Sequence, residues 1–192
     1  MKVLIAKLIR EAFNEAHSQR NGRSNSERSK LWVECLAHGL RTIPWERQVA
    51  VFSRDYNNNQ SEFRLNELLF DITVAEVEII KSVRGANITT ITAAKWLVES
   101  EFNKTDSRDV IIDFSKLVIG SSENKLLVIS AESSLTSWAK EVIPDILKCI
   151  NCNFFLAFLP HPEDWDAEDL PSIHVYRLTA TGWLPIQSSE PA

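Results

Sequence analysis

The sequence predicts a single α/β domain in which helices flank a mixed central β-sheet. The chain has 192 residues, of which 44% are hydrophobic, which suits one domain with a substantial core. Helical spacing of apolar residues near the N-terminus gives way to a strand-like pattern after about residue 47. Helical and strand-like segments then alternate, an order typical of a sheet covered by helices. We expect one domain over residues 1–192, with a core at about 27–131 and a C-terminal α/β extension at 132–192.

The first half of this pattern predicts two helices followed by three strands. The helices are expected over residues 1–17 and 27–40, on either side of a polar segment that contains Gly22 and several serines. The strands are expected over residues 48–53, 62–74 and 95–102. Asn57 to Asn59 form a turn-favouring run between the first two strands.

The second half predicts a crossover and then further alternation. A helix over residues 109–118, closed by Gly120, leads into a continuous apolar run at 125–131, which suits a strand buried on both faces of a sheet. The remaining expected elements are a helix over 134–150, a strand over 153–159, an acidic turn or short helix over 163–169 and a strand over 173–178. This order, helix, three strands, helix, strand, predicts an αβββαβ core with a mixed sheet.

Composition limits the classes of protein to consider. No run approaches the roughly 18 apolar residues that a membrane-spanning helix needs, and Lys7, Arg10 and Glu11 interrupt the apolar N-terminus too early for a secretory signal. Three cysteines cannot form a disulfide framework, so we expect a soluble, cytoplasmic protein. The net charge of −5 argues against a protein that coats nucleic acid by bulk electrostatics.

Acidic residues interrupt two of the predicted strands. Asp71 is the one acid within an apolar run, and Glu99 and Glu101 project from the same face of the next strand because side chains alternate. If these strands are neighbours, about 4.8 Å apart, the three carboxylates can converge. Three neighbouring carboxylates repel one another unless a cation or protons compensate their charge. Oxygen-only ligands favour Mg²⁺, Ca²⁺ or Mn²⁺ over Zn²⁺, and we expect Mg²⁺ or Mn²⁺. The alternative is a solvated or salt-bridged face of the sheet.

Four short segments carry a resemblance to a known superfamily. They are Glu67-Leu-Leu-Phe-Asp71, Trp96-Leu-Val-Glu99-Ser-Glu101-Phe102, Asp113-Phe-Ser-Lys116-Leu117, and the helical residue Glu34. In this order, and within the expected αβββαβ core, they resemble the PD-(D/E)XK, or restriction-endonuclease-like, nuclease superfamily. The resemblance covers residues 31–131, about half of the chain, and its motifs are short and degenerate.

The resemblance implies roles for individual residues. Asp71 corresponds to the aspartate that bridges the metal ions, and Glu99 to the second metal ligand. Glu101 stands where the superfamily usually has lysine, so it would be a ligand or orient the attacking water. A displaced lysine could supply the missing charge, with Lys116 the stronger candidate and Lys95 the weaker one.

Three further features have both a functional and an ordinary explanation. Glu34 corresponds to the acid that the first core helix often contributes to the metal site, but it could equally be a helix-surface residue. Lys116 could simply pair with Asp113 three residues earlier. The basic segment Arg20 to Lys30 could contact phosphates or could be a solvated loop.

These observations predict a metal-dependent nuclease that hydrolyses phosphodiester bonds in DNA. Its catalytic residues would be Asp71, Glu99, Glu101 and Lys116, its cofactor Mg²⁺ or Mn²⁺, and its partner nucleic acid, with a possible homodimer and no membrane association. The alternative is a catalytically inactive protein of the same fold that serves as a nucleic-acid-binding or assembly subunit.

Overall fold

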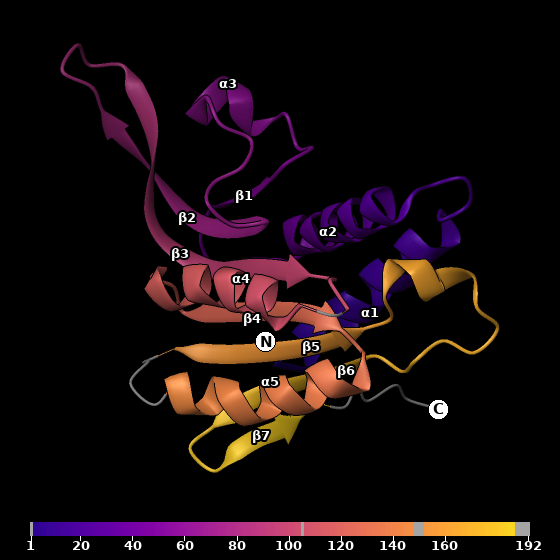
Figure 1. Ribbon diagram of the computed structural model, residues 1–192. Helices are drawn as coiled ribbons and strands as arrows, with labels where there is room; N and C mark the ends of the chain where they lie inside the picture. Colours follow the sequence, from indigo (N-terminus) through magenta and orange to yellow (C-terminus); the bar gives the residue numbers. More distant parts are fainter. Residues whose placement is uncertain (1, 105, 148–151, 187–192) are drawn as a thin grey trace.

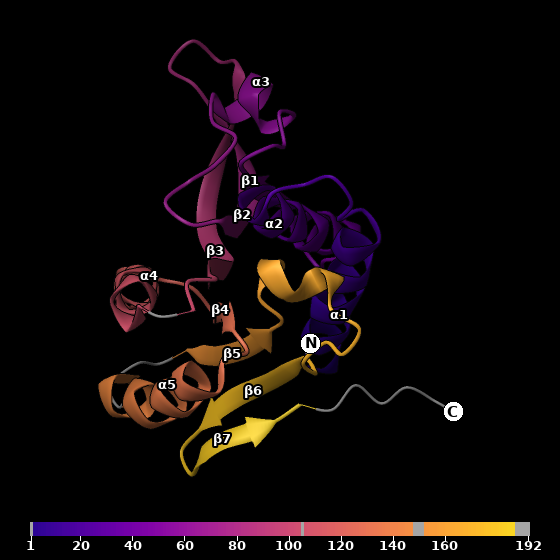
Figure 2. The ribbon, with the colours of Figure 1, turned by 45° about the vertical axis from the view of Figure 1, so that its right-hand side comes forward.

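A seven-stranded mixed β-sheet with helices on both faces forms the body of the protein, as Figures 1 and 2 show. The computed structural model describes residues 2–104, 106–147 and 152–186. The strands lie in sequence order and are β1 (Val49–Ser53), β2 (Ile72–Lys81), β3 (Asn87–Glu101), β4 (Asn124–Ser130), β5 (Asn153–Leu159), β6 (His174–Thr179) and β7 (Gly182–Pro185). The helices are α1 (Lys2–Ser18), α2 (Asn25–Thr42), α3 (Asn59–Phe63), α4 (Ser107–Ile119), α5 (Ser133–Ile146) and the 3₁₀ helix η2 (Pro162–Asp166). The predicted fold class, a mixed sheet flanked by helices, is confirmed.

The direction of the strands follows from their connections. β1, β2 and β3 pair antiparallel, whereas β3, β4 and β5 pair parallel, with α4 and α5 as the crossover helices. The predicted strand–helix–strand crossover is therefore confirmed. β6 and β7 add an antiparallel hairpin at the far edge, of which only the first strand was predicted.

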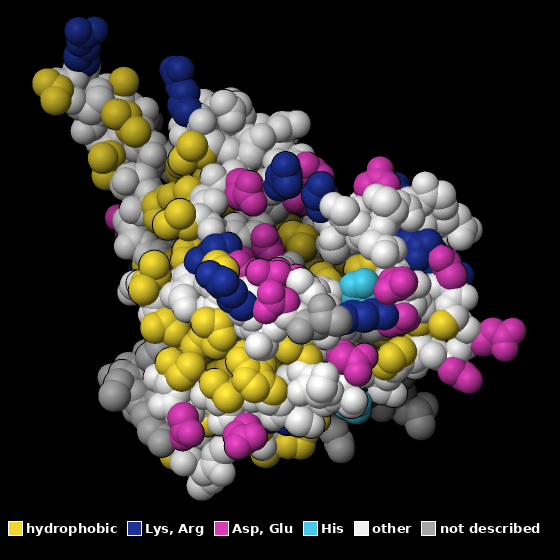
Figure 3. All heavy atoms as spheres, in the orientation of Figure 1, with side chains coloured by type: hydrophobic (Ala, Val, Ile, Leu, Met, Phe, Trp, Pro, Cys, Tyr) yellow, Lys and Arg dark blue, Asp and Glu magenta, His cyan; other side chains and the backbone are white. Residues whose placement is uncertain are grey.

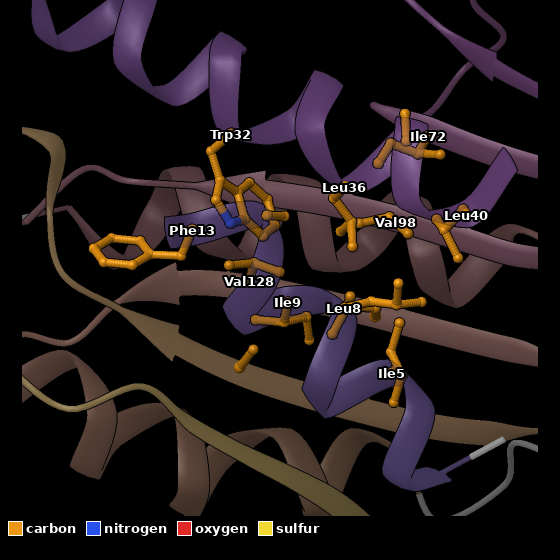
Figure 4. Packing of buried hydrophobic residues seen from close by; sticks show 14 of the residues in the cluster. Ile5, Leu8, Ile9, Phe13, Trp32, Leu36, Leu40, Ile72, Val98 and Val128 are labelled. Atoms are coloured by element: carbon orange, nitrogen blue, oxygen red, sulfur yellow. The ribbon is translucent and has the colours of Figure 1, made fainter. Parts of the chain in front are cut away.

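Alternation of side chains along the central strands creates two cores. Trp96 and Val98 of β3 pack in the layer of α1 and α2, where Figure 4 shows Trp32 and Leu36 of α2 beside Ile9 of α1. The intervening Leu97 packs in the other layer, with residues of α4 and α5. Successive residues of β3 thus belong to different layers, which decides where the acids at its end can point.

Two helices begin at residues that cap them. Ser24 accepts a hydrogen bond from the Glu27 backbone, and the Glu27 side chain accepts one from the Ser24 backbone, forming a capping box for α2. Asp106 caps α4 by accepting a hydrogen bond from the backbone of Arg108. These caps fix the first turns of the helices that flank the end of β3.

The strand predicted over residues 62–74 is wrong for most of its length. Residues 59–63 form the short helix α3, which ends at Arg64 with a left-handed φ of 61°. An irregular segment follows, and β2 begins only at Ile72. Asp71 therefore lies just before the strand rather than within it.

β2 and β3 extend beyond their neighbours as a two-stranded arm, visible at the upper left of Figure 1. β1 pairs with β2 only as far as the Val77 backbone, and β4 reaches β3 only from Ala94 onward. The arm includes exposed apolar side chains such as Ile79 (60%). β3 thus starts eight residues before the predicted strand, because the arm has no buried face to mark it in the sequence.

The C-terminal third follows the prediction except for β7, which was not predicted. The expected helix over 134–150 is observed as α5, which ends at Ile146, and the end of that prediction, at 148–150, lies outside the described residues. The acidic segment predicted as a turn or short helix at 163–169 is helical only as far as Asp166, where η2 ends. Within the described residues, no helix has the length and apolar character required to cross a membrane.

Candidate functional site

The antiparallel pairing of β2 with β3 places Asp71 and Glu99 on neighbouring strand ends. Ile72 is paired with Val98, so extending the register by one residue sets Asp71 opposite Glu99. Opposed residues of an antiparallel pair leave the sheet on the same face, here that of Leu97 and α4. The structure thus brings these two predicted residues together.

Asp71 is held at the end of the sheet by Ser100. Its Oδ2 accepts hydrogen bonds from the Ser100 backbone nitrogen at 2.9 Å and from the Ser100 hydroxyl at 2.6 Å. Burial raises the pKa of Asp71; the two bonds from Ser100 lower it, the charge of Asp113 raises it, and the net shift is upward. A serine between the two glutamates of β3 therefore fixes this carboxylate, a role that the sequence analysis missed.

Glu99 is almost completely enclosed, with 1% of the residue exposed. One carboxylate oxygen, Oε2, lies 3.4 Å from Nζ of Lys116, while the other, Oε1, is buried without a hydrogen-bond partner. Burial raises the pKa of Glu99 to about 8, with further increases from the charges of Asp71 and Asp113 and an opposing effect from Lys116. Glu99 is thus a buried acid that favours its protonated form, because Lys116 compensates a negative charge at this position only in part.

Lys116 of α4 contacts the site, as expected of a displaced lysine. Its ammonium also lies 2.7 Å from Asp113, so the expected pairing within the helix is present as well. Lys95 does not belong to the site, because it pairs at 2.6 Å with both Glu76 and Glu123 near the other end of the parallel strands. The weaker of the two lysine candidates is therefore wrong.

Glu101 lies two residues further along β3 and is half-buried. Its Oε1 accepts a hydrogen bond from the Asn103 backbone at 2.6 Å. Burial raises the pKa of Glu101, the bond from Asn103 lowers it, and the charges of Asp113 and Asp109 raise it, with an upward net shift. The charge of Asp113 therefore raises the pKa of Glu101, as it does those of Asp71 and Glu99.

Glu34 of α2 makes contacts that explain its position without a metal ion. Its Oε2 accepts from the Ser53 hydroxyl at 2.8 Å, and its Oε1 accepts from the Asp55 backbone at 3.0 Å. These bonds fasten the turn after β1 to α2. Both carboxylate oxygens are thus engaged, although Glu34 still faces the same cavity as Asp71 and Glu101.

That cavity, of about 300 Å³, opens between α2, the turn after β1 and the end of β3. Its wall is formed by Ser29, Lys30, Val33, Glu34, Arg54, Asp55, Glu67, Asp71, Ser100, Glu101 and Phe102. Figure 3 shows Asp and Glu side chains gathered near the middle of this side of the molecule, with Lys and Arg side chains around them. Asp71 and Glu101 are therefore reachable from solvent, whereas Glu99 is 1% exposed and is not part of the cavity wall.

The donor set suits a hard cation, but it is not assembled as a metal site. Among the residues that the structure describes, no three His, Cys, Asp or Glu side chains form a group that could hold a metal ion. The carboxylates of Asp71, Glu99 and Glu101 supply only oxygen donors, and Oε1 of Glu99 is a buried acceptor with no partner. The residues fit Mg²⁺ or Mn²⁺ by type, and binding would require carboxylates to turn towards a common point.

In the basic segment Arg20 to Lys30, which could contact phosphates, Arg20 and Arg28 already form ion pairs within the protein. Arg28 pairs with Asp166 of η2 at 2.5 Å and donates to the Pro162 carbonyl, and Arg20 pairs with the same Asp166 at 3.0 Å. These residues fasten η2 to the α1–α2 connection. Of this segment, Lys30 lines the cavity.

Comparisons with known proteins give little guidance. No protein-family model matches the chain, and the search of curated proteins found no match. A solved structure that is similar is the YaeQ protein from Xanthomonas axonopodis pv. citri, over 86% of this chain and 79% of that one. The identity is 13% and the TM-score 0.32, a similarity too slight to support an argument about this chain.

Proposed function

We propose that this protein is a divalent-metal-dependent nuclease that hydrolyses phosphodiester bonds in DNA, on a restriction-endonuclease-like αβββαβ core. The observation that carries the proposal is Glu99, a buried carboxyl with one unpartnered oxygen beside Asp71 and Lys116. A buried acid in this state needs a proton or a cation to compensate it. The strand order and the α4 crossover agree with the core that the resemblance implies.

Each residue has a defined part in this proposal. Asp71 and Glu99 would hold the ion, and Glu101, at the solvent-facing side of the group, would be a further ligand or would orient the attacking water. A bound Mg²⁺ or Mn²⁺ would polarise the phosphodiester and lower the pKa of a water molecule. Lys116 would stabilise negative charge near Glu99, to which its ammonium is already directed.

The same structure also supports an alternative without catalysis. Glu101 stands in the place of the usual lysine, and the described carboxylates do not form a ready metal group. A protein of this fold that binds nucleic acid or assembles with a partner, including a second copy of itself, would have these features. Only an activity measurement separates the two proposals.

The test is cleavage of plasmid and single-stranded DNA in Mg²⁺ and in Mn²⁺ by the wild type and by two isosteric variants, Asp71→Asn and Glu99→Gln. Each variant keeps its side-chain volume and loses the ability to carry negative charge. Glu168→Gln, at an exposed position after η2, is the matched control. Loss of cleavage in both site variants but not in the control supports the nuclease. Cleavage that survives both substitutions refutes the site, and no cleavage in either metal favours the inactive subunit.

A further inference from the structure

Two basic side chains line the cavity beside the candidate site and act on nearby acids only through their charges, Arg54 on Glu67 and Lys30 on Glu27. Lys30 comes from α2 and Arg54 from the turn that follows β1. Within the described ranges, neither side chain makes a hydrogen bond or an ion pair. Two neighbouring arginines do have such contacts: Arg28 forms an ion pair with Asp166, and Arg41 donates a hydrogen bond to Ser53.

The absence of an ion pair is informative because acidic side chains are close to both cations. Five carboxylates share the cavity wall with the two cations, namely Glu34, Asp55, Glu67, Asp71 and Glu101. Lys30 and Arg54 nevertheless lie beyond ion-pair distance of all of them. They are therefore available to an anion that arrives from outside.

The backbone that carries Arg54 is fastened on both sides. Glu34 accepts a hydrogen bond from Ser53, the residue before Arg54, and another from the backbone of Asp55, the residue after it. Arg41 donates to the same Ser53 hydroxyl at 2.5 Å. A cation on a fixed backbone needs less ordering when it binds a ligand. This gives Glu34 a positioning role, while its expected role as a metal ligand stays a prediction.

The geometry points to a phosphate subsite: we propose that Lys30 and Arg54 bind a backbone phosphate of nucleic acid next to the acidic group. Guanidinium groups bind phosphate through paired hydrogen bonds, and ammonium groups bind it as compact charges. The nucleic acid then lies over α2 and the turn after β1, not over α4, where Lys116 is occupied by Asp113 and Glu99. The identity of the ligand as nucleic acid rests on the proposed function.

The experiment measures binding of a labelled duplex by fluorescence anisotropy at a series of KCl concentrations, with Ca²⁺ present. Losing two phosphate contacts in Lys30→Ala/Arg54→Ala should lower the slope of log K against log[salt] by roughly 1.8, or about 0.9 per contact. The control is Lys7→Ala/Arg47→Ala, which removes one lysine and one arginine charge at side chains that are 64% and 72% exposed. Its slope should match that of the wild type.

The outcomes separate this subsite from the nuclease proposal. A reduced slope in Lys30→Ala/Arg54→Ala alone supports the subsite even if the wild type cleaves nothing. Equal slopes in both double variants overturn it, even if the wild type is an active nuclease, and so does a wild type that does not bind the duplex. Displacement of the duplex by inorganic phosphate, at ionic strength matched with KCl, would assign the two cations to free phosphate instead.

Discussion

The pKa of Glu99 predicts that the protein loses stability as pH rises through the neutral range. A glutamate in an unfolded chain ionises near pH 4.5, whereas Glu99 in the folded protein holds its proton up to about pH 8. Between these values the folded state binds one proton more than the unfolded state, so the free energy of unfolding falls with increasing pH. Below this window both states are protonated, and above it both are ionised, so the contribution of Glu99 is constant there.

The magnitude follows from the size of the shift. A difference of one pKa unit corresponds to about 1.4 kcal/mol, so the full shift of about 3.5 units sets an upper limit of about 5 kcal/mol. Between pH 5.5 and 7.5 the loss due to Glu99 should approach ~2.7 kcal/mol. The raised pKa values of Asp71 and Glu101 act in the same direction. A comparison with Glu99→Gln isolates the part that belongs to Glu99.

Urea denaturation at several pH values, followed by the fluorescence of the six tryptophans, measures this dependence. Glu99→Gln cannot ionise, so its stability should decline less with pH, and the two proteins should diverge as pH increases. Glu168→Gln should follow the wild type. If the wild type and Glu99→Gln keep parallel profiles from pH 5.5 to 8.5, Glu99 does not titrate as a buried acid and the electrostatic reasoning for the site fails.

Three further predictions concern the same region. Binding of Mg²⁺ near Glu99 should release a proton at pH 7, which calorimetry in two buffers of different ionisation enthalpy detects; no proton release would contradict the burial of this acid. Lys116→Met removes a charge that lowers the pKa of Glu99, so the pH window for the loss of stability should extend further upward in the same denaturation series. Gly120→Ala would place a methyl group 2.5 Å from Leu97 and 2.7 Å from Phe70, and thermal or urea denaturation should show a loss of about 1–3 kcal/mol.

Much of the central sheet could be predicted because its burial leaves a local pattern. β4 and β5 are buried along nearly their whole length, and their continuous apolar runs carry that information in the sequence itself. α4 was predicted for the same reason, since Val110, Phe114 and Leu117 form one buried helical stripe. The order of these elements then predicted the crossover.

Segments whose residues are not buried on a regular face could not be predicted in this way. Residues 59–71 pass through a five-residue helix, a left-handed residue at Arg64 and an irregular stretch, which their apolar residues do not distinguish from a strand. The arm formed by β2 and β3 has its outer half exposed, and register irregularities near Ala75 interrupt its alternation. A sequence shows little hydrophobic periodicity where no face of the segment is regularly buried.

In the candidate site, too, contacts within one strand or helix could be predicted, and contacts between distant segments could not. The close pairs, Glu99 with Glu101 and Asp113 with Lys116, could be predicted from spacing alone because strand and helix periods fix them. Contacts between distant segments could not, such as the bonds from Ser100 to Asp71 and the pairing of Arg28 with Asp166. These contacts depend on how strand ends and loops meet, for which one sequence holds no local signal.

Lys116 alone does not compensate a negative charge on Glu99. The single ammonium lies closer to Asp113, at 2.7 Å, than to Glu99, at 3.4 Å, and it touches only one oxygen of the latter. Asp71 receives two hydrogen bonds from Ser100, which only partly offset the rise of its pKa caused by burial. The carboxyl group of Glu99 is therefore compensated by a proton or, in the proposed function, by a metal ion. If the proposed metal ion binds there, proton and cation compete for the same carboxyl group, so the pH dependence of stability and that of metal binding should change together in any variant that alters it.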